Sequence, residues 1–292
     1  MGNTFNDATT ATGATALMTI AELKRYMRIT VSTYDTLLTE LRDGTTNVIE
    51  DYCGRHFVAG SYAKWFNGTG ENILYLDEVP VTAVAQLSID TLNALSVTCG
   101  ASDATHASVT VTATGVVLLV SDGASAGTTT RLFSGYATLA LMAAAINSAT
   151  GSWTATVQGN LDSYRSSQLQ LMPAQFCASD TAAYLLIPDD PEEAFRYDAD
   201  NGALMLEWGV FPEGQRNVYV AWTAGYSTIP NAVLSVCREL VAQMYNAGAR
   251  NPTLQSERRA EYAWTAASGE SVSGYLTSQQ RARLAPYKDH LP

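Results

Sequence analysis

Apolar residues recur at helical spacing in the first part of the chain. The segment Thr19-Ile-Ala-Glu22 forms a capping box, and Met18 before it can pack on Leu23, so a short helix is predicted to begin here and to end near residue 28. Apolar residues then continue at steps of three and four from about residue 32 up to Gly54. This pattern predicts a second, longer helix that ends at the glycine.

Three more helices are predicted in the last part of the chain. The first begins at Pro230 or Asn231 and has one apolar face over three turns, formed by Val233, Val236, Cys237, Leu240, Val241, Met244 and Tyr245. Two shorter helices are expected from Gln255 to Ala267 and from Ser278 to Leu284. Together with the first two helices, they look like two halves of one helical unit.

Between the two helical groups, alternating apolar and polar residues predict strands. Residues 62–66 and 73–76 alternate on either side of a glycine-rich turn, and Asn201-Gly202 separates two extended runs, which is a strong hairpin signal. Residues 218–222 also alternate. The proline of Ile229-Pro230 keeps Ile229 out of helical geometry, so this strand and the helix after it must separate at a fixed angle.

The segment 91–187 differs in composition from the rest. Only six of its residues are charged, and it is rich in serine, threonine and alanine, with short strand-like runs at 108–113, 116–121, 153–157, 168–172 and 182–187 that glycines separate. One helix is expected among them, capped by Thr138, with a buried stripe of Leu139, Met142 and Ile146. We therefore expect a small β-rich domain inserted into another domain.

These patterns predict an α+β fold. A mainly helical core with short β-hairpins is expected from residues 17–90 and 188–267 together, and the β-rich inserted domain with its one helix from residues 91–187. Residues 1–16 are predicted to form a flexible N-terminal arm, and residues 268–292 a C-terminal helix and tail.

Composition and charge disfavour several classes of protein. The 292 residues include 17 basic and 28 acidic ones, a formal net charge of −11, so the surface repels DNA phosphates and sequence-specific DNA binding is disfavoured. The four cysteines are scattered and show no metal-ligand spacing, which favours a reduced, cytosolic origin. The sequence shows no secretory signal pattern, and no apolar run approaches the ~20 residues that cross a bilayer.

Three patterns suggest chemistry, and each has a simpler explanation. Cys53 and His56 are a possible nucleophile and base, but Cys53 lies on the apolar face of the predicted second helix, which favours a buried structural thiol. The acidic run 189–202 is out of register for a calcium loop, and Gly68-x-Gly70 lacks the third glycine of a phosphate loop. No catalytic, cofactor-binding or metal-binding residue and no enzyme activity are therefore predicted, and a hydrolase using Cys53 or the 189–200 carboxylates ranks last.

Two further features suit contacts between proteins. No basic groove accompanies the aromatic residues of the last third, so we expect these to lie in the core or at a subunit interface: Trp222, Tyr226, Tyr245, Tyr262 and Trp264. From Ala249 onward the chain has six basic and four acidic residues, unlike the acidic remainder. Such a tail suits docking onto another protein. For any single residue of the tail, a position in a solvated helix end or tail, without a docking role, is an equally good explanation.

Four stretches, in this order, resemble the head-to-tail connector (adaptor) family of tailed bacteriophages. They are LMTIAELKRYMRIT, the helix ending VIEDYCGRHF, NGTGENILYLDEVPVTAV, and the stretch from Tyr197 to Asn246. The most recognisable elements are L-x-L-x-x-x-P-V at residues 74–81, and VYV at 218–220 followed by Gly225-Tyr226 and Ile229-Pro230 before a helix. The resemblance covers roughly residues 17–90 and 188–267, and its motifs are packing patterns.

The resemblance implies a structural, non-enzymatic subunit of a virion neck, made in the cytoplasm of the bacterial host. Members of the family form a twelvefold ring beneath the portal protein, extend the channel for double-stranded DNA, and receive head-closure or tail proteins on the other side. No cofactor and no membrane contact are implied. Because the family's C-terminal segment reaches the portal, the candidate portal contacts are Tyr275, Leu276, Arg281, Arg283, Leu284, Tyr287 and Lys288.

The inserted segment 91–187 differs from the family pattern, because family members have only a short connection between the two corresponding parts. The position of residues 91–187 suits a domain that projects outward from a ring. It also leaves an alternative function open, in which the protein is a virion surface adhesion or decoration protein and this threonine-rich domain is the binding module.

Overall fold

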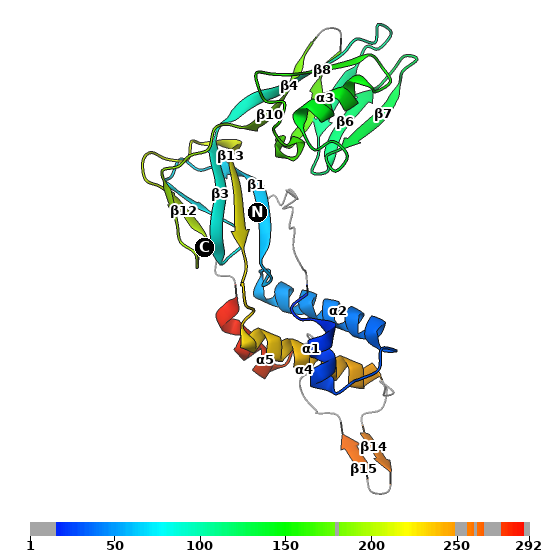
Figure 1. Ribbon diagram of the computed structural model, residues 1–292, viewed down its shortest axis with the longest axis vertical. Helices are drawn as coiled ribbons and strands as arrows, with labels where there is room; N and C mark the ends of the chain where they lie inside the picture. Colours follow the sequence, from blue (N-terminus) through cyan, green and yellow to red (C-terminus); the bar gives the residue numbers. More distant parts are fainter. Residues whose placement is uncertain (1–15, 179–180, 249–255, 260–261, 266–275, 289–292) are drawn as a thin grey trace.

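The chain forms three bodies that follow one another along the long axis of the molecule (Figure 1). The computed structural model describes residues 16–178, 181–248, 256–259, 262–265 and 276–288, and within them the chain forms fifteen strands and five α-helices. A helical body lies at one end and a β-body in the middle. The inserted body, whose buried core residues lie between Ala94 and Ile187, occupies the other end.

The prediction of an α+β fold with a mainly helical core is wrong, because 36% of the structure is strand and only 27% is helix. The segments expected to be short hairpins beside a helical core form a β-body with two sheets and a core of its own. The physical reason is pairing between strands from opposite sides of the insertion, since β1 (Gly60–Gly68) pairs with β13 (Gly214–Ala224). A local hydrophobic pattern does not reveal such distant partners.

The helical body consists of α1 (Ile20–Met27), α2 (Asp35–Cys53), α4 (Asn231–Gly248) and α5 (Ser278–Leu284). The predicted capping box before α1 is confirmed, and Gly54 ends α2 in the left-handed conformation, as predicted. Helices from both ends of the sequence share one core, which includes Leu23, Leu38, Ile49, Cys53, Val233, Val236, Cys237, Leu240, Val241 and Leu284. No helix in the described ranges combines the length and the apolar character needed to span a membrane.

The β-body contains two three-stranded antiparallel sheets. In the first sheet, β13 lies between β1 and β3 (Val81–Ile89). In the second, β12 (Ala203–Leu206) lies between β11 (Phe195–Tyr197) and β2 (Ile73–Tyr75). The hairpin predicted around Asn201-Gly202 is thus confirmed, whereas the strand pair predicted from residues 62–66 and 73–76 is wrong, since β1 pairs with β13 and β2 pairs with β12.

Trp222 lies at the centre of the β-body core. Side chains alternate along a strand, so Val218, Val220 and Trp222 of β13 point into the core while the residues between them face the other side. The Trp222 side chain is 1% exposed, and its ring centroid lies 5.6 Å from that of Tyr62 and 5.8 Å from that of Phe66. The indole N–H of Trp222 donates a hydrogen bond to the carbonyl oxygen of Glu78 at 3.3 Å, which satisfies its one polar atom.

The inserted body has two sheets and the helix α3 (Leu139–Asn147). The predicted cap is confirmed, because the Thr138 hydroxyl accepts a hydrogen bond from the Leu141 N–H, and the predicted buried stripe of α3 is fully buried. The run at 168–172 was expected to be a strand and is not, since Ser166–Gln168 form the 3-10 turn η1. The strand order in the three-stranded sheet is β10 (Ala183–Pro188), β4 (Thr91–Cys99) and β8 (Trp153–Val157). The strand order in the four-stranded sheet is β7 (Gly127–Leu132), β6 (Gly115–Val120), β5 (Ala107–Val111) and β9 (Met172–Phe176).

A hairpin replaces the helix predicted from Gln255 to Ala267, and that prediction is wrong. Strands β14 (Ser256–Arg259) and β15 (Tyr262–Thr265) pair in antiparallel orientation, with Arg259 opposite Tyr262. Tyrosine, tryptophan and threonine in the second strand favour extended backbone, which competes with helix formation in this segment. The helix predicted from Ser278 to Leu284 is confirmed as α5, and the 3-10 turn η2 (Ala285–Tyr287) follows it.

Candidate functional site

The C-terminal helix α5 is held against the helical body by buried apolar side chains. Of the candidate portal contacts, Leu276 is 6% exposed and Leu284 is fully buried, so both belong to the core that α5 shares with α2 and α4. A capping box of Thr277 and Gln280 begins the helix. The apolar face of α5 is therefore occupied within the chain, and only its polar face is open to another protein.

That polar face carries positive charge. The guanidinium of Arg283 lies 2.7 Å from the Glu239 carboxylate of α4, and this hydrogen bond raises the pKa of Arg283. The Lys288 ammonium lies 4.6 Å from the centroid of the Tyr52 ring, a cation-π contact. Arg283 and Lys288 are exposed, Arg281 and Tyr287 are half-buried, and the candidate residue Tyr275 lies outside the described residues.

The candidate interface aromatics do not gather at one place. Trp222 is buried in the β-body core, whereas Tyr226 packs against the helical-body core and stacks on Phe57, with 6.0 Å between ring centroids. The Tyr245 ring contacts the Tyr34 ring edge-on at 5.9 Å. The side chains of the other two candidates, Tyr262 and Trp264, lie outside the part of the chain whose side chains are described. A subunit-interface role for Tyr226 and Tyr245 stays a prediction.

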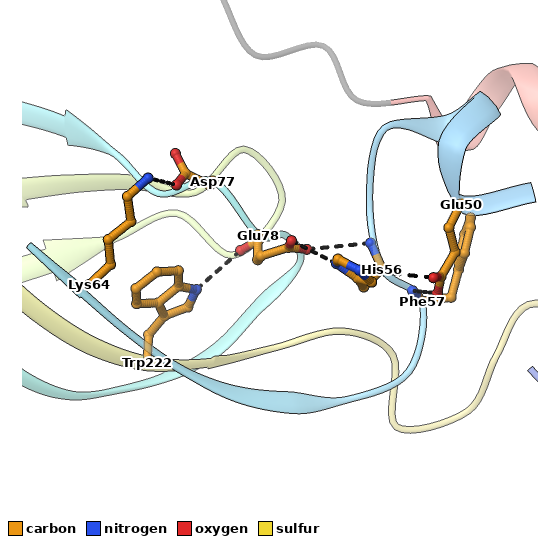
Figure 2. Close-up of polar contacts among 7 residues, drawn as sticks. All are labelled: Glu50, His56, Phe57, Lys64, Asp77, Glu78 and Trp222. Carbon is orange, nitrogen blue, oxygen red and sulfur yellow. Dashed lines mark hydrogen bonds and ion pairs between the residues drawn. The ribbon is translucent and has the colours of Figure 1, made fainter. Parts of the chain in front are cut away.

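A polar cluster that the sequence did not indicate joins the helical body to the β-body. Figure 2 shows the His56 ring between the carboxylates of Glu50, from α2, and Glu78, from the loop before β3. The ring's Nδ1 lies 2.7 Å from Glu78 Oε1, and its Nε2 lies 4.0 Å from Glu50 Oε2. Glu50 also accepts a hydrogen bond from the Phe57 N–H at 3.2 Å. The cluster therefore connects the end of α2 with both the chain leading into β1 and the β-body.

The pKa values of His56 and Glu50 are both raised in this joint. The hydrogen bond to Glu78 raises the pKa of His56, and burial raises the pKa of Glu50, although the Phe57 N–H opposes the latter. Asp51 and Tyr62 are further titratable groups that interact with the carboxylates of the cluster. Both shifts favour the protonated forms in the folded chain. Protonation of His56 strengthens its ion pair with Glu78, whereas protonation of Glu50 removes the charge that faces the ring's Nε2.

This geometry predicts a pH-dependent stability. Because the folded pKa of His56 is raised above its ordinary value of 6.5, its contribution is complete below about pH 6.5 and is lost as pH rises through the folded pKa. Replacing Glu78 by glutamine should therefore cost about 0.5–1 kcal/mol at pH 5.5, the range for partly exposed ion pairs. Urea unfolding should show this difference shrinking by pH 8.5, and a difference that stays constant would contradict the assignment.

Cys53 and His56 do not form a nucleophile and base pair. Burial raises the pKa of the Cys53 thiol to about 11, and no hydrogen bond joins it to His56 in the described structure. His56 faces two carboxylates instead. In the acidic run, the Asp198 carboxylate accepts a hydrogen bond from the Asp200 N–H at 3.0 Å, in the loop between β11 and β12.

A cleft of about 740 Å³ separates the outer face of the first sheet from the inserted body. Trp65 and Tyr219 lie on its floor with 5.1 Å between their ring centroids, and burial raises the pKa of Tyr219. Gln168 of the inserted body donates a hydrogen bond to Gln86 of β3 at 3.2 Å. Near the cleft, the Gln170 side chain also donates to the Arg216 carbonyl oxygen. These contacts hold the inserted body on the sheet.

An exposed tryptophan is the second feature that the sequence analysis missed. Trp208 follows β12 and is 82% exposed, and Val210 two residues later is 50% exposed. The loop is anchored by Phe211, which is fully buried and donates its N–H to the Glu71 carbonyl oxygen at 2.7 Å. The signal in the sequence is Glu207-Trp-Gly-Val-Phe211, in which Gly209 turns the chain between two apolar residues and the buried phenylalanine.

Comparisons with known proteins give a likeness at the level of structure. No protein-family model matches the chain, and no curated protein matches it. Among solved structures, a chain from the neck of an empty gene transfer agent particle, computed with C6 symmetry, is 11% identical with a TM-score of 0.42, covering 96% of this chain and 95% of that chain.

Two further solved structures are similar to the same extent. A chain from the virion of a native gene transfer agent particle is 12% identical with a TM-score of 0.40, covering 96% of this chain and 95% of that chain. A chain from the neck of the native particle, computed with C12 symmetry, has the same identity and TM-score and covers 96% and 94%. These TM-scores lie below 0.5, so the function proposed below rests on this chain's own sequence and geometry.

Proposed function

We propose that this protein is a structural subunit of a phage neck ring, a head-to-tail adaptor, with no catalytic role. In this proposal it is located in the virion neck, docks under the portal protein, extends the DNA channel and receives head-closure or tail proteins. The ring is a homo-oligomer, with twelve copies as the expected number. Residues 17–90 and 188–267 act as its connector part, and residues 91–187 as an inserted domain.

One observation carries this proposal. The two motifs on which the sequence resemblance depends lie on opposite sides of the insertion, and the fold brings them together. Leu74, Leu76 and Val81 of the first motif share one buried core with Val218 and Val220 of the second. The Gly225 N–H also donates a hydrogen bond to the Pro80 carbonyl oxygen at 2.9 Å. The motif residues thus form one packing unit at the point where the β-body meets the helical body.

The charge of the chain suits a DNA passage. A channel wall that bound phosphates would retain a genome that has to slide during ejection. The formal net charge of −11 provides repulsion instead. Double-stranded DNA is therefore expected to pass without sequence-specific binding.

The proposed docking to the portal can be tested at the polar face of α5. Replacing both Arg283 and Lys288 by alanine removes exposed charge and leaves the buried Leu284 in place. We expect the affinity for the purified portal protein to fall by about tenfold or more, because rim charges steer and orient such contacts. Co-sedimentation with portal measures this effect. Arg196→Ala in the β-body, whose side chain is 77% exposed, is the matched control and should leave binding unchanged.

Failure of the wild-type chain to co-sediment with its portal would overturn the proposed function. Equal binding by the wild type and the Arg283→Ala, Lys288→Ala variant would instead place the portal contact on another surface. The two outcomes are distinguishable within one set of samples.

A second function is favoured by the outer face of the inserted body. Tyr184, Ser96 and Thr156 lie in one row across β10, β4 and β8, with Thr98 and Thr154 in the next row, and this face carries no charged side chain. An uncharged, hydroxyl-rich face with an exposed tyrosine suits adhesion to a neutral surface. Particles in which residues 91–187 are deleted should then join heads to tails and adsorb poorly to cells, whereas normal adsorption would contradict this role.

A further inference from the structure

The charge of the connector part is divided unequally between its two bodies. Residues 61–90 and 188–217, which build most of the β-body, contain twelve acidic and three basic residues. Residues 17–60, 231–248 and 276–288, which build the helical body, contain seven acidic and nine basic residues. One chain therefore presents a strongly acidic body and a weakly basic body at different heights along its length.

Each body also exposes large apolar side chains. On the acidic β-body the most exposed are Trp208 and Val210, ahead of Tyr75 and Tyr197. Glu207, which pairs with Arg196 at 2.9 Å, and Glu213 are exposed close by in sequence. On the helical body, exposed apolar residues concentrate in α1, the start of α2 and the loop between them: Tyr26, Val31, Tyr34 and Leu37. The same corner exposes Arg25 and Arg28, while Lys24 is already paired with Asp35 at 2.7 Å.

These two patches have the properties of the two halves of one interface. A tryptophan on an anchored loop is a typical binding hot spot, since its large rigid side chain buries much area at little entropic cost. Acidic residues around it select a partner with positive charge, which the α1–α2 corner has. In Figure 1 β12, which precedes the Trp208 loop, lies on the left flank, and the loop between α1 and α2 lies on the right flank.

We propose that copies of this chain associate head to tail, with the Trp208 loop of one copy seated on the α1–α2 corner of the next copy. Two unlike surfaces on opposite flanks make a heterologous contact, which generates a ring when the rotation closes. The inference rests on the proposed function, because that function requires a ring, and it adds the surfaces through which the ring forms.

Cysteine cross-linking tests this contact with few side reactions, because the four native cysteines are buried. Val210→Cys, which keeps Trp208 in place on the same loop, and Leu37→Cys are prepared as separate single variants, mixed with portal protein, and treated with a short thiol cross-linker. We expect a cross-linked dimer only when the two variants are present together. Leu132→Cys, on an exposed strand of the inserted body, replaces Val210→Cys in the matched control and should give no dimer with Leu37→Cys.

Two further readouts keep the inference testable without cysteines. Trp208→Ala is expected to weaken self-association by about 30-fold or more, the effect of a hot-spot truncation, without loss of the folded monomer. Raising the salt from about 0.05 M to about 0.5 M should lower the cross-linking yield several-fold, because the contact pairs unlike charges.

Three outcomes overturn the inference. The first is dimers from Val210→Cys alone, which indicate a symmetric contact. The second is unchanged self-association of Trp208→Ala, and the third is absence of the mixed dimer in samples where portal is bound. The last outcome leaves the proposed function standing and moves the ring contact elsewhere. Absence of both portal binding and the mixed dimer overturns the two proposals together.

Discussion

Replacing Trp222 by alanine is expected to lower the free energy of unfolding by about 3–5 kcal/mol, the range for removing a buried tryptophan. The side chain is 1% exposed and fills the centre of the β-body core between the rings of Tyr62 and Phe66. Alanine would leave a cavity, and the Glu78 carbonyl oxygen would lose its indole donor. Chemical denaturation of the purified chain, followed by circular dichroism, measures the change.

Trp208→Ala is the matched control, because it removes the same side chain from a position that is 82% exposed. The free energy of unfolding of the monomer should change by no more than about 0.5 kcal/mol. If the two variants lose the same stability, Trp222 is not the centre of a packed core. The pair also separates folding from assembly, since Trp208→Ala is expected to impair only self-association.

Replacing Gly225 by alanine is expected to cost about 2–5 kcal/mol, because it combines backbone strain with overpacking. Gly225 has a backbone φ of 106°, which residues other than glycine rarely adopt. An added Cβ would lie 2.6 Å from the Val58 carbonyl oxygen and 2.7 Å from the Ala59 Cα atom. Both neighbours are backbone atoms of the segment that joins α2 to β1, so neither can move without disturbing the joint between the bodies. Thermal unfolding of the variant measures the loss.

Gly44 in the middle of α2 provides a control in which the same glycine-to-alanine change should raise, and not lower, the free energy of unfolding. No atom lies within 4 Å of the position of its added Cβ, and the residue is exposed and helical. Gly44→Ala is therefore expected to raise the free energy of unfolding by about 0.5–1 kcal/mol, because alanine loses less backbone freedom on folding. Destabilisation by both alanine variants would contradict the local geometry described for α2.

Local signals in the sequence were sufficient for the elements that are held by short-range contacts. The capping box at Thr19, the glycine stop at Gly54 and the cap at Thr138 all act within one helical turn, so the helix boundaries could be predicted from neighbours. The hairpin at Asn201-Gly202 is also local, and Gly202 adopts a positive φ of 69° there.

The arrangement of the strands could not be predicted, because their partners are distant in sequence. Tyr62 of β1 lies opposite Trp222 of β13, and nothing in the alternation of either strand identifies the other. This is why the β-body was expected to be hairpins beside a helical core. The residues of the joint were missed for the same reason, since His56 and Glu78 come from different elements and meet only when the bodies pack.

The candidate site was predicted in part. The confirmed α5 explains why Leu276 and Leu284 look like docking residues in sequence, since an amphipathic pattern does not show whether its apolar face meets the same chain or another one. In this structure that face is internal. The exposed Arg283 and Lys288 remain the proposed portal contacts, and Trp208 was overlooked because a single tryptophan in a loop follows no period.

Cryo-electron microscopy of the neck of the assembled particle would show where this chain lies and what it contacts. We expect a ring of copies of this chain immediately beneath the portal, with the polar face of α5 against the portal and residues 91–187 projecting outward. A neck without this chain, or copies of it found elsewhere on the particle, would rule out the proposed adaptor role.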